Sequence, residues 1–257
     1  MTDACPVWRV RHRAVTESTN KDALAGAPGD VFTADLQTAG RGRLDHRWLS
    51  PPGENLMMSA VIGVADMSPE EVATLPLVVG LAVVEAAETL LAERGVAEVS
   101  ADLRVKWPND VLIGGRKACG ILCERKDERV IAGIGVNVNQ TMFDPEIAAR
   151  ATSLLLAVRG SGAQSPESGV GPATFSIPTV RDAVLAQLTN LLVPWRQDGF
   201  HAIWPQIAAR DFLKGRTISV RRMDGDVVPV TGFCGGIRSD GALEIAGEPI
   251  FAGEVFW

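Results

Sequence analysis

Runs of apolar positions, separated by glycine, proline and charged residues, divide the chain into strands and helices followed by a final segment of short strands. Residues 31–37 and 55–64 predict two strands, the second of them largely buried. A capping box at residues 68–71 predicts a helix that continues to about residue 94. Pro76 indicates either a kink or a later true start of this helix. Its inward face is predicted to carry Leu77, Leu81, Val84, Ala87 and Leu91.

The middle of the chain predicts a set of paired strands. Short apolar pieces at 105–107 and 111–113 are followed by the glycine pair at 114–115, which is typical of a hairpin turn. Strands at 117–125 and 129–138 are then predicted to pair across a charged turn.

Three further helices and one long loop are expected. Ser18 has the chemistry of an N-cap and predicts a short helix directly after it. Residues 160–178 are rich in glycine, serine and proline, and predict a mobile surface loop. Helices are predicted at 179–197 and 201–209.

After Leu213 the pattern changes to short strands alone, predicted at 217–220, 227–232, 242–245 and 254–257. Glycines between them indicate tight turns, as in a small β-barrel. The expected fold is therefore α+β, with a mixed sheet flanked by helices in residues 1–212 and a small β-barrel in residues 213–257.

Composition narrows the classes of function. The chain has 257 residues and a net charge of −6, so it has no overall cationic field for DNA or for anionic lipid. No apolar run reaches about 18 residues, and residues 1–13 lack a signal-peptide core, so a soluble cytosolic protein is expected. The four cysteines form no CxxC pair, and we interpret Cys119 and Cys123 as small core residues rather than as ligands or a disulfide.

The first candidate site motif is Gly40-Arg41-Gly42-Arg43, which follows a predicted strand. Glycine lets a ligand approach the backbone closely, and arginine binds phosphate or carboxylate. A solvated basic turn is the alternative. The motif is not a P-loop, because no GxxxxGK(S/T) sequence occurs in the chain. It is not a dinucleotide-binding turn either, because arginine stands where tight packing requires a small residue.

The second motif places two lysines, Lys106 and Lys117, near an Asn109-Asp110 pair. Lysines are seldom buried without a partner. Two partly buried lysines would repel each other unless an anion lies between them, and a carboxylate and a nucleoside triphosphate are the leading candidates. The alternative is that Asp110 satisfies Lys106.

A third motif alternates glycine with β-branched residues in Gly133-Ile134-Gly135-Val136-Asn137. Glycine weakens a strand unless something approaches it closely. A flat ligand on this strand is one interpretation, and a bulge or tight strand packing is the other. The sequence has no nucleophile elbow, which argues against a serine hydrolase.

Taken in order, these motifs resemble those of the biotin protein ligases. The matching motifs run from the Glu-Ser-Thr-Asn stretch at 17–20 to residue 137, and their order and spacing fit the family's catalytic domain, which has about 200 residues. The tail resembles the family's SH3-like C-terminal domain. It implies a class II synthetase-like catalytic domain. The missing Arg-Arg-x-Ser-Gly-Gly-Gly signature argues against the rival, a lipoate or octanoate transferase. A degenerate biotin- or nucleotide-binding module is the other rival.

The resemblance implies a two-step reaction. ATP and biotin give biotinyl-5′-adenylate and pyrophosphate, with Mg²⁺ as cofactor, and the biotinyl group then passes to one lysine of a biotin carboxyl carrier domain. It also implies a cytoplasmic enzyme, monomeric or homodimeric. A short form that lacks an N-terminal DNA-binding domain is expected, since the catalytic pattern begins by Glu17.

The resemblance also assigns roles to residues. Biotin is expected to contact Ser18, Thr19, Asn20, Gln37, Gly40, Arg41, Lys117, Gly120, Gly133 and Gly135. ATP and the adenylate are expected to contact Arg43, Trp48, Lys106, Asn109, Lys117 and Asn137. Catalysis is assigned to Lys117, Arg41 and Arg43, and metal binding to Asp110.

One position departs from the family pattern. Where the family often has a second Gly-Arg pair, this chain has Asp45-His46. Asp45 is expected to pair with Arg43 or Arg47 and to stiffen the loop. Because ordering a backbone costs roughly 1–2 kcal/mol per residue, the loop from residue 40 to 48 is expected to be poorly ordered without ligand.

Overall fold

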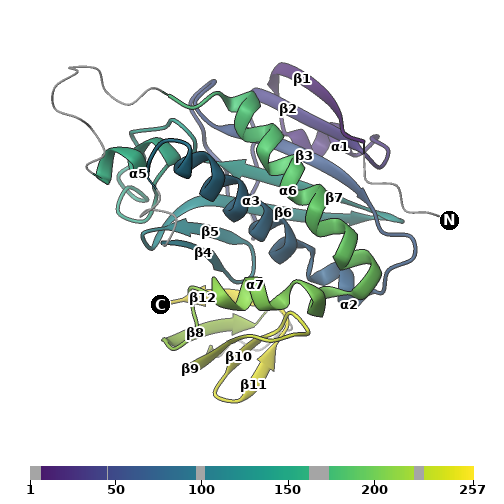
Figure 1. Ribbon diagram of the computed structural model, residues 1–257, viewed down its shortest axis with the longest axis vertical. Coiled ribbons are helices and arrows are strands. Elements are labelled where there is room, and N and C mark those ends of the chain that lie inside the picture. Colours follow the sequence, from purple (N-terminus) through teal and green to yellow (C-terminus); the bar gives the residue numbers. More distant parts are fainter. Residues whose placement is uncertain (1–6, 45, 97–101, 162–173, 223–228) are drawn as a thin grey trace.

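A seven-stranded mixed sheet carries the first part of the chain, and a five-stranded antiparallel sheet carries the last part (Figure 1). The computed structural model describes residues 7–44, 46–96, 102–161, 174–222 and 229–257. The large sheet has the order β1-β2-β3-β7-β6-β5-β4, in which β1 and β2 are parallel and the other neighbours are antiparallel. Its strands are β1 (Arg9–Thr16), β2 (Asp30–Gln37), β3 (Leu56–Gly63), β4 (Leu103–Lys106), β5 (Asp110–Ile113), β6 (Arg116–Lys126) and β7 (Arg129–Val136).

Two long helices cover one face of this sheet and leave the other face for the site (Figure 1). Along β3, Met58, Ala60 and Ile62 join the core under the helices, while the alternate residues Met57 and Ser59 face the opposite way. The helices of the described residues are α1 (Thr19–Ala23), α2 (Pro69–Ala73), α3 (Leu75–Ala92), α5 (Leu154–Gly160), α6 (Ile177–Asp198), the 3₁₀ helix η1 (Phe200–Ala202) and α7 (Trp204–Ala209).

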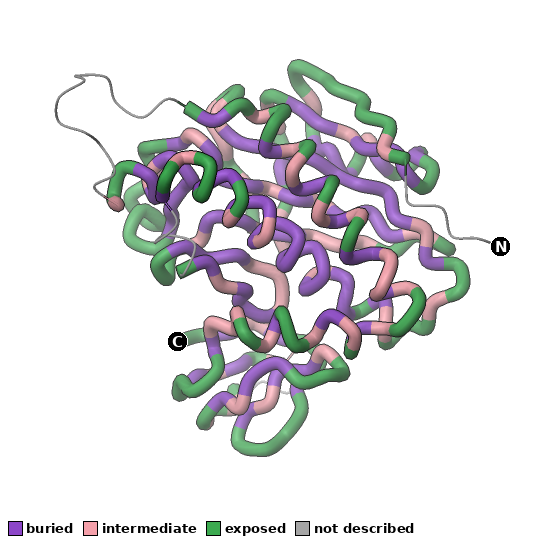
Figure 2. The backbone as a smooth tube through the Cα atoms, in the orientation of Figure 1, coloured by how far each residue is buried: buried purple, intermediate pink, exposed green. Residues whose placement is uncertain are grey.

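The helix predicted from residue 68 is divided into α2 and α3 at Thr74, which ends the first and caps the second. Pro76 therefore lies in the first turn of α3, where no backbone N–H is needed, which confirms the later start. By length and composition α3 could cross a membrane, but 72% of it is buried between the sheet and α6. It is the core helix of the fold, and all five residues of its predicted inward face are buried (Figure 2).

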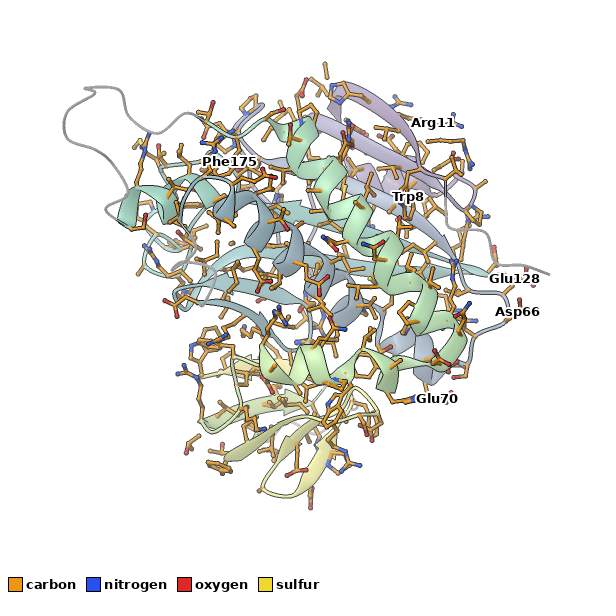
Figure 3. The ribbon with its side chains drawn as sticks, in the orientation of Figure 1. Trp8, Arg11, Asp66, Glu70, Glu128 and Phe175 are labelled. Atoms are coloured by element: carbon orange, nitrogen blue, oxygen red, sulfur yellow. The ribbon has the colours of Figure 1, made fainter. Side chains whose placement is uncertain are left out.

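Strand β1 was not predicted, because its side chains are almost all exposed and its arginines hide any alternation. It forms the edge of the sheet by parallel pairing with β2. Just before it, the indole N–H of Trp8 donates to Thr189 of α6 at 2.8 Å, which joins the edge to the helical layer (Figure 3). Helix α5 and strand β11 were also missed.

The second sheet has the order β11-β10-β9-β8-β12. Its strands are β8 (Thr217–Arg222), β9 (Val230–Ile237), β10 (Leu243–Ile245), β11 (Glu248–Ile250) and β12 (Gly253–Phe256). The expected α+β class and second sheet are confirmed, but β11 and β12 remain edges in the described part of the chain, so strand pairing does not close a barrel there. The strand predicted at 227–232 is placed later, at β9.

Buried polar contacts attach the second sheet to the body. The carboxylate of Asp211 accepts hydrogen bonds from the backbone N–H groups of Leu213 and Ile237, both at 2.8 Å. The indole N–H groups of Trp204 and Trp107 donate to Ile237 and Gly241. The predicted domain boundary at 212/213 lies between α7 and β8 and stays a prediction.

Two further sequence predictions concern the loop at 160–178 and the cysteines. Of the predicted loop at 160–178, residues 162–173 lie outside the described residues. Among the cysteines, Cys119 and Cys234 are buried and Cys123 is half-buried, all with free thiols. Burial raises the pKa of the Cys123 thiol to about 12, which suits an inert packing role.

Candidate functional site

A cavity of about 990 Å³ lies on the face of the large sheet opposite α3 and α6. The loop at 40–48, the segment at 143–151 and strand β12 border it. Of the predicted site residues, only Gly40 does not line it. Gly40 lines an adjoining hollow of about 460 Å³ under the same loop. The cavity-lining predicted residues are Ser18, Thr19, Asn20, Gln37, Arg41, Arg43, Trp48, Lys106, Asn109, Asp110, Lys117, Gly120, Gly133, Gly135 and Asn137.

Paired glycines form the floor of the cavity. Gly120 of β6 pairs with Gly135 of β7, and the ring of Trp48 lies against both. A methyl group at residue 135 would come within 2.5 Å of the indole, and one at residue 133 would overlap the side chain of Asn20. The β6–β7 ladder runs without a register shift, so close approach of side chains, rather than a bulge, explains these glycines.

A buried polar network occupies one end of the cavity. The backbone N–H of Thr19 donates to Gln37 Oε1 at 2.7 Å. Ser59 Oγ, which is fully buried, lies 2.8 Å from Thr19 Oγ1 and 2.6 Å from Asn20 Oδ1. Ser18 holds the predicted N-cap position of α1, but its hydroxyl makes no capping hydrogen bond and lines the cavity instead. This end can therefore recognise a small polar group.

A cationic cluster occupies the other end. One carboxylate, that of Asp110, lies between the two lysines, 2.6 Å from Lys117 Nζ and 3.3 Å from Lys106 Nζ. Lys106 is only 9% exposed, and burial lowers its pKa, an effect that Asp110 opposes. The alternative in which Asp110 satisfies Lys106 is thus correct, and the same carboxylate also pairs with Lys117.

Arg43 brings the loop to this cationic cluster. Its guanidinium donates to Asn109 Oδ1 at 3.2 Å and to the carbonyl of Gly253 on β12 at 3.3 Å. Burial lowers its pKa, and Asp110 and Glu254 oppose that shift. Asn109 is itself fixed by donating to the carbonyl of Ile121 at 2.7 Å. The cluster therefore brings three cations, Arg43, Lys106 and Lys117, close to the carboxylate of Asp110, and Glu254 adds a second negative charge nearby.

The described residues of the loop between Gly40 and Trp48 pair as a small hairpin, in which residues 40–42 lie against 46–48. The N–H of Trp48 donates to Gly40 at 3.0 Å, and the N–H of Gly42 donates to His46 at 2.7 Å. The expected salt bridge of Asp45 lies outside the described residues. The expected disorder of this loop without ligand stays a prediction.

Residues of the C-terminal segment contact the cationic cluster, and the sequence did not predict these contacts. The Lys106 ammonium lies 4.0 Å from the centre of the Trp257 ring, which in turn makes an edge contact with Phe212. Glu254 faces the same cations. The only sequence signal for these contacts was the aromatic pair that follows Glu254 and Val255. Asn137, a predicted ligand contact, uses its amide to hold the carbonyl of Thr152 at 3.0 Å.

The number of possible protein ligands indicates which kind of metal ion the cavity could bind. Among the residues that the structure describes, no three histidine, cysteine or acidic side chains converge on one point. In the same part of the chain, the buried Oδ1 of Asp110 accepts no hydrogen bond of good geometry, although it lies 2.6 Å from Lys117 Nζ. A single oxygen donor of this kind suits Mg²⁺, which binds through one or two carboxylates together with substrate phosphates.

Comparisons with known proteins point in one direction. The model of the biotin/lipoate A/B protein ligase family matches residues 9–140. The biotin–[acetyl-CoA-carboxylase] ligase of Mycobacterium tuberculosis is 33% identical over 214 residues, which cover 81% of this chain and 71% of that protein. The bifunctional ligase/repressor BirA of Bacillus spizizenii is 39% identical over 171 residues, covering 62% of this chain but only 49% of its own length.

The fold agrees with these sequence matches. The biotin protein ligase of Aquifex aeolicus, solved in complex with biotin and ATP, superposes with a TM-score of 0.77 at 27% identity. The match covers 96% of this chain and 97% of that structure.

Proposed function

The chain belongs to the biotin/lipoate A/B protein ligase family, and we propose that it activates biotin with ATP and transfers the biotinyl group to a lysine of an acceptor protein. It is an ATP-dependent ligase of biotin, in line with the biotin–[acetyl-CoA-carboxylase] ligase that it resembles and with the Aquifex aeolicus structure that contains biotin and ATP. One observation carries the proposal. A single cavity joins a buried polar network, suited to a small polar ring, to a cationic cluster suited to phosphates.

In the first step, a carboxylate oxygen of biotin attacks the α-phosphorus of ATP, and the bond to pyrophosphate breaks. Both reacting groups are negatively charged and repel each other. Lys117, whose ammonium lies at the cationic end and whose side chain is 39% exposed, screens that repulsion. Arg43 and Lys106 bind the phosphates, and Arg41 belongs to the loop that covers the biotin. No covalent enzyme intermediate is needed, since holding the substrates together accounts for much of the rate.

Asp110 would hold the Mg²⁺ that accompanies ATP. Bound there, the ion would supply positive charge to balance that of the departing pyrophosphate. Asn109, the neighbour of Asp110 in the chain, accepts a hydrogen bond from Arg43 and so orients that side chain. In this proposal Asp110 therefore binds the metal, and Asn109 positions the loop.

In the second step, the amine of the acceptor lysine attacks the carbonyl carbon of the adenylate, and AMP leaves. The adenylate is also open to hydrolysis, so water must stay out until the acceptor arrives. Trp48, packed on the glycine floor, and the 40–48 hairpin cover this region. We propose that the acceptor is the biotin carboxyl carrier domain of a biotin-dependent carboxylase.

We propose further that the protein works in the cytoplasm without binding DNA, as a monomer or a homodimer. The net charge of −6 supports the absence of DNA binding, because no overall cationic field is available for phosphate backbones.

Release of pyrophosphate in the presence of ATP and Mg²⁺ tests this function. Biotin is expected to stimulate release, whereas lipoate and octanoate are not. Stimulation by lipoate alone would make the protein a lipoate ligase. Tight binding of biotin with no pyrophosphate release would identify a degenerate binding module.

A further inference from the structure

One acidic side chain joins the hairpin at 40–48 to the sheet beneath it. Arg41 Nη2 lies 2.8 Å from Oε1 and 2.9 Å from Oε2 of Glu124, which projects from β6. The two residues are 83 positions apart in the chain. The hydrogen bonds within the hairpin, such as the one from Trp48 to Gly40, shape the loop but do not attach it to the sheet.

Glu124 is held in place from the buried side. Its Oε2 accepts a hydrogen bond from Asn20 Nδ2 at 2.6 Å. Asn20 in turn accepts from the fully buried Ser59 hydroxyl at 2.6 Å and lies against Gly133. A continuous polar chain therefore runs from the loop through Glu124 into the network at the biotin end of the cavity.

The anchoring of Glu124 by Asn20 increases the free energy that the Arg41–Glu124 ion pair contributes to holding the loop. Exposed pairs contribute little, because two long side chains must be ordered in water, and the side chains of Arg41 and Glu124 are 54% and 34% exposed. Here the carboxylate is already fixed by Asn20, so only the arginine loses freedom when the pair forms. A second attachment of the loop is the hydrogen bond from Arg43 to Asn109.

We propose that Glu124 is a positioning residue that holds the 40–48 hairpin over the cavity through Arg41 and so retains the activated intermediate between the two steps. The proposal rests on the proposed function, since it assigns Glu124 to that same site. Glu124 does not touch the reacting atoms in this account. It acts only through Arg41 and Asn20.

The test compares Glu124→Gln with Glu128→Gln. The first variant keeps an oxygen for Asn20 but removes the charge that attracts Arg41. The second removes an exposed carboxylate from the turn between β6 and β7, at the edge of the molecule (Figure 3). Hydrogen exchange of ligand-free protein reads the loop directly, without any requirement for activity.

Backbone amides of residues 40–48 are expected to exchange about fivefold faster in Glu124→Gln, the factor that corresponds to about 1 kcal/mol. Exchange in Glu128→Gln should equal that of the wild type. In the wild type, raising the salt concentration should accelerate the same amides, because a half-exposed pair is screened, and the Glu124 variant should not respond. Equal exchange in all three proteins would overturn the proposal, whatever the enzyme's activity.

Pyrophosphate release without acceptor provides the functional readout. Wild-type enzyme should release about one equivalent rapidly and then turn over slowly, as the retained adenylate blocks the site. Glu124→Gln should show the same rapid phase and a slow phase about fivefold faster. A lost rapid phase in this variant alone would make Glu124 part of the binding site and overturn the positioning role. A lost rapid phase in the wild type would refute the proposed function, while the exchange experiment would still decide on the loop.

Discussion

Oδ1 of Asp110 lies 2.6 Å from Nζ of Lys117, while the second oxygen of the same carboxylate lies 3.3 Å from Nζ of Lys106. The carboxylate of Asp110 thus offsets the mutual repulsion of the two ammonium groups. ATP and biotin bring more negative charge to this place, so the lysines can exchange part of their contact with Asp110 for contact with substrate. The pre-formed cluster avoids the cost of gathering these cations during the reaction.

Removal of Lys117 is expected to block the first step and leave the fold intact. In Lys117→Met the carboxylate of Asp110 still pairs with Lys106, so no buried charge loses every partner. Adenylate formation should fall by about 10²–10³-fold, the usual effect of losing one donor to a developing charge. Biotin-dependent pyrophosphate release measures this rate. Lys126→Met, an exposed lysine on the same strand, is the matched control and should retain full activity.

The glycine floor predicts a selective loss of nucleotide binding. In Gly135→Ala the new methyl group would lie 2.5 Å from the Trp48 ring, which must leave the floor. Affinity for a non-hydrolysable ATP analogue should fall about tenfold, or about 1.4 kcal/mol, by calorimetric titration. Gly80→Ala in α3 is the control. Its methyl group has 3.6 Å to the nearest atom, and alanine should stabilise the helix by up to about 1 kcal/mol. Unchanged affinity in Gly135→Ala would remove Trp48 from the nucleotide site.

The protonated state of Lys106 predicts that kcat/KM for ATP falls at alkaline pH. Burial lowers the pKa of Lys106, and the negative charges of Asp110 and Glu254 raise it again. Glu254→Gln removes one of these charges, so Lys106 loses its proton at a lower pH. The alkaline limb of kcat/KM for ATP should therefore move to lower pH, as pH–rate profiles will report. Glu248→Gln, at an exposed position on β11, should leave the limb in place. A shift toward higher pH in Glu254→Gln would contradict the assignment.

Asp30 predicts acid sensitivity of the sheet edge. The N–H of Ala27 donates to its carboxylate at 3.0 Å, and Arg9 pairs with it at 2.9 Å, so its pKa lies below the ordinary value of 3.8. A lowered folded-state pKa means that the stabilisation is complete above the ordinary value and is lost as the pH falls through the folded-state value. Asp30→Asn should melt a few degrees lower at pH 7, at roughly 2–4 °C per kcal/mol, and the difference should shrink toward pH 3. An undiminished difference at pH 3 would argue against this role.

Short motifs at strand ends were enough to predict residues at both ends and on the floor of the cavity. Residues 106–110, Lys117 and the glycines of β6 and β7 meet because neighbouring antiparallel strands bring sequence-local motifs to one face of one sheet. Local pattern also predicted a kink or a later helix start near Pro76, which the structure resolves as a new helix after Thr74, and it predicted the buried face of α3.

Residues that reach the site through tertiary packing could not be predicted in this way. Glu124 looked like an ordinary charge near a turn, and its meaning depends on Arg41, far away in the sequence. Trp257 reaches Lys106 only because the second sheet docks on the body. Strand β1 was missed for the opposite reason, as its exposed side chains carry no hydrophobic signal and its order comes from pairing with β2.

The central claim is tested most directly by the intact mass of a purified biotin carboxyl carrier domain after incubation with this protein, ATP, Mg²⁺ and biotin. We expect the wild type to add one biotin to the acceptor and Lys117→Met to add almost none in the same time. Failure of the wild type to add biotin, with the acceptor shown to be modified by another biotin ligase, would contradict the account.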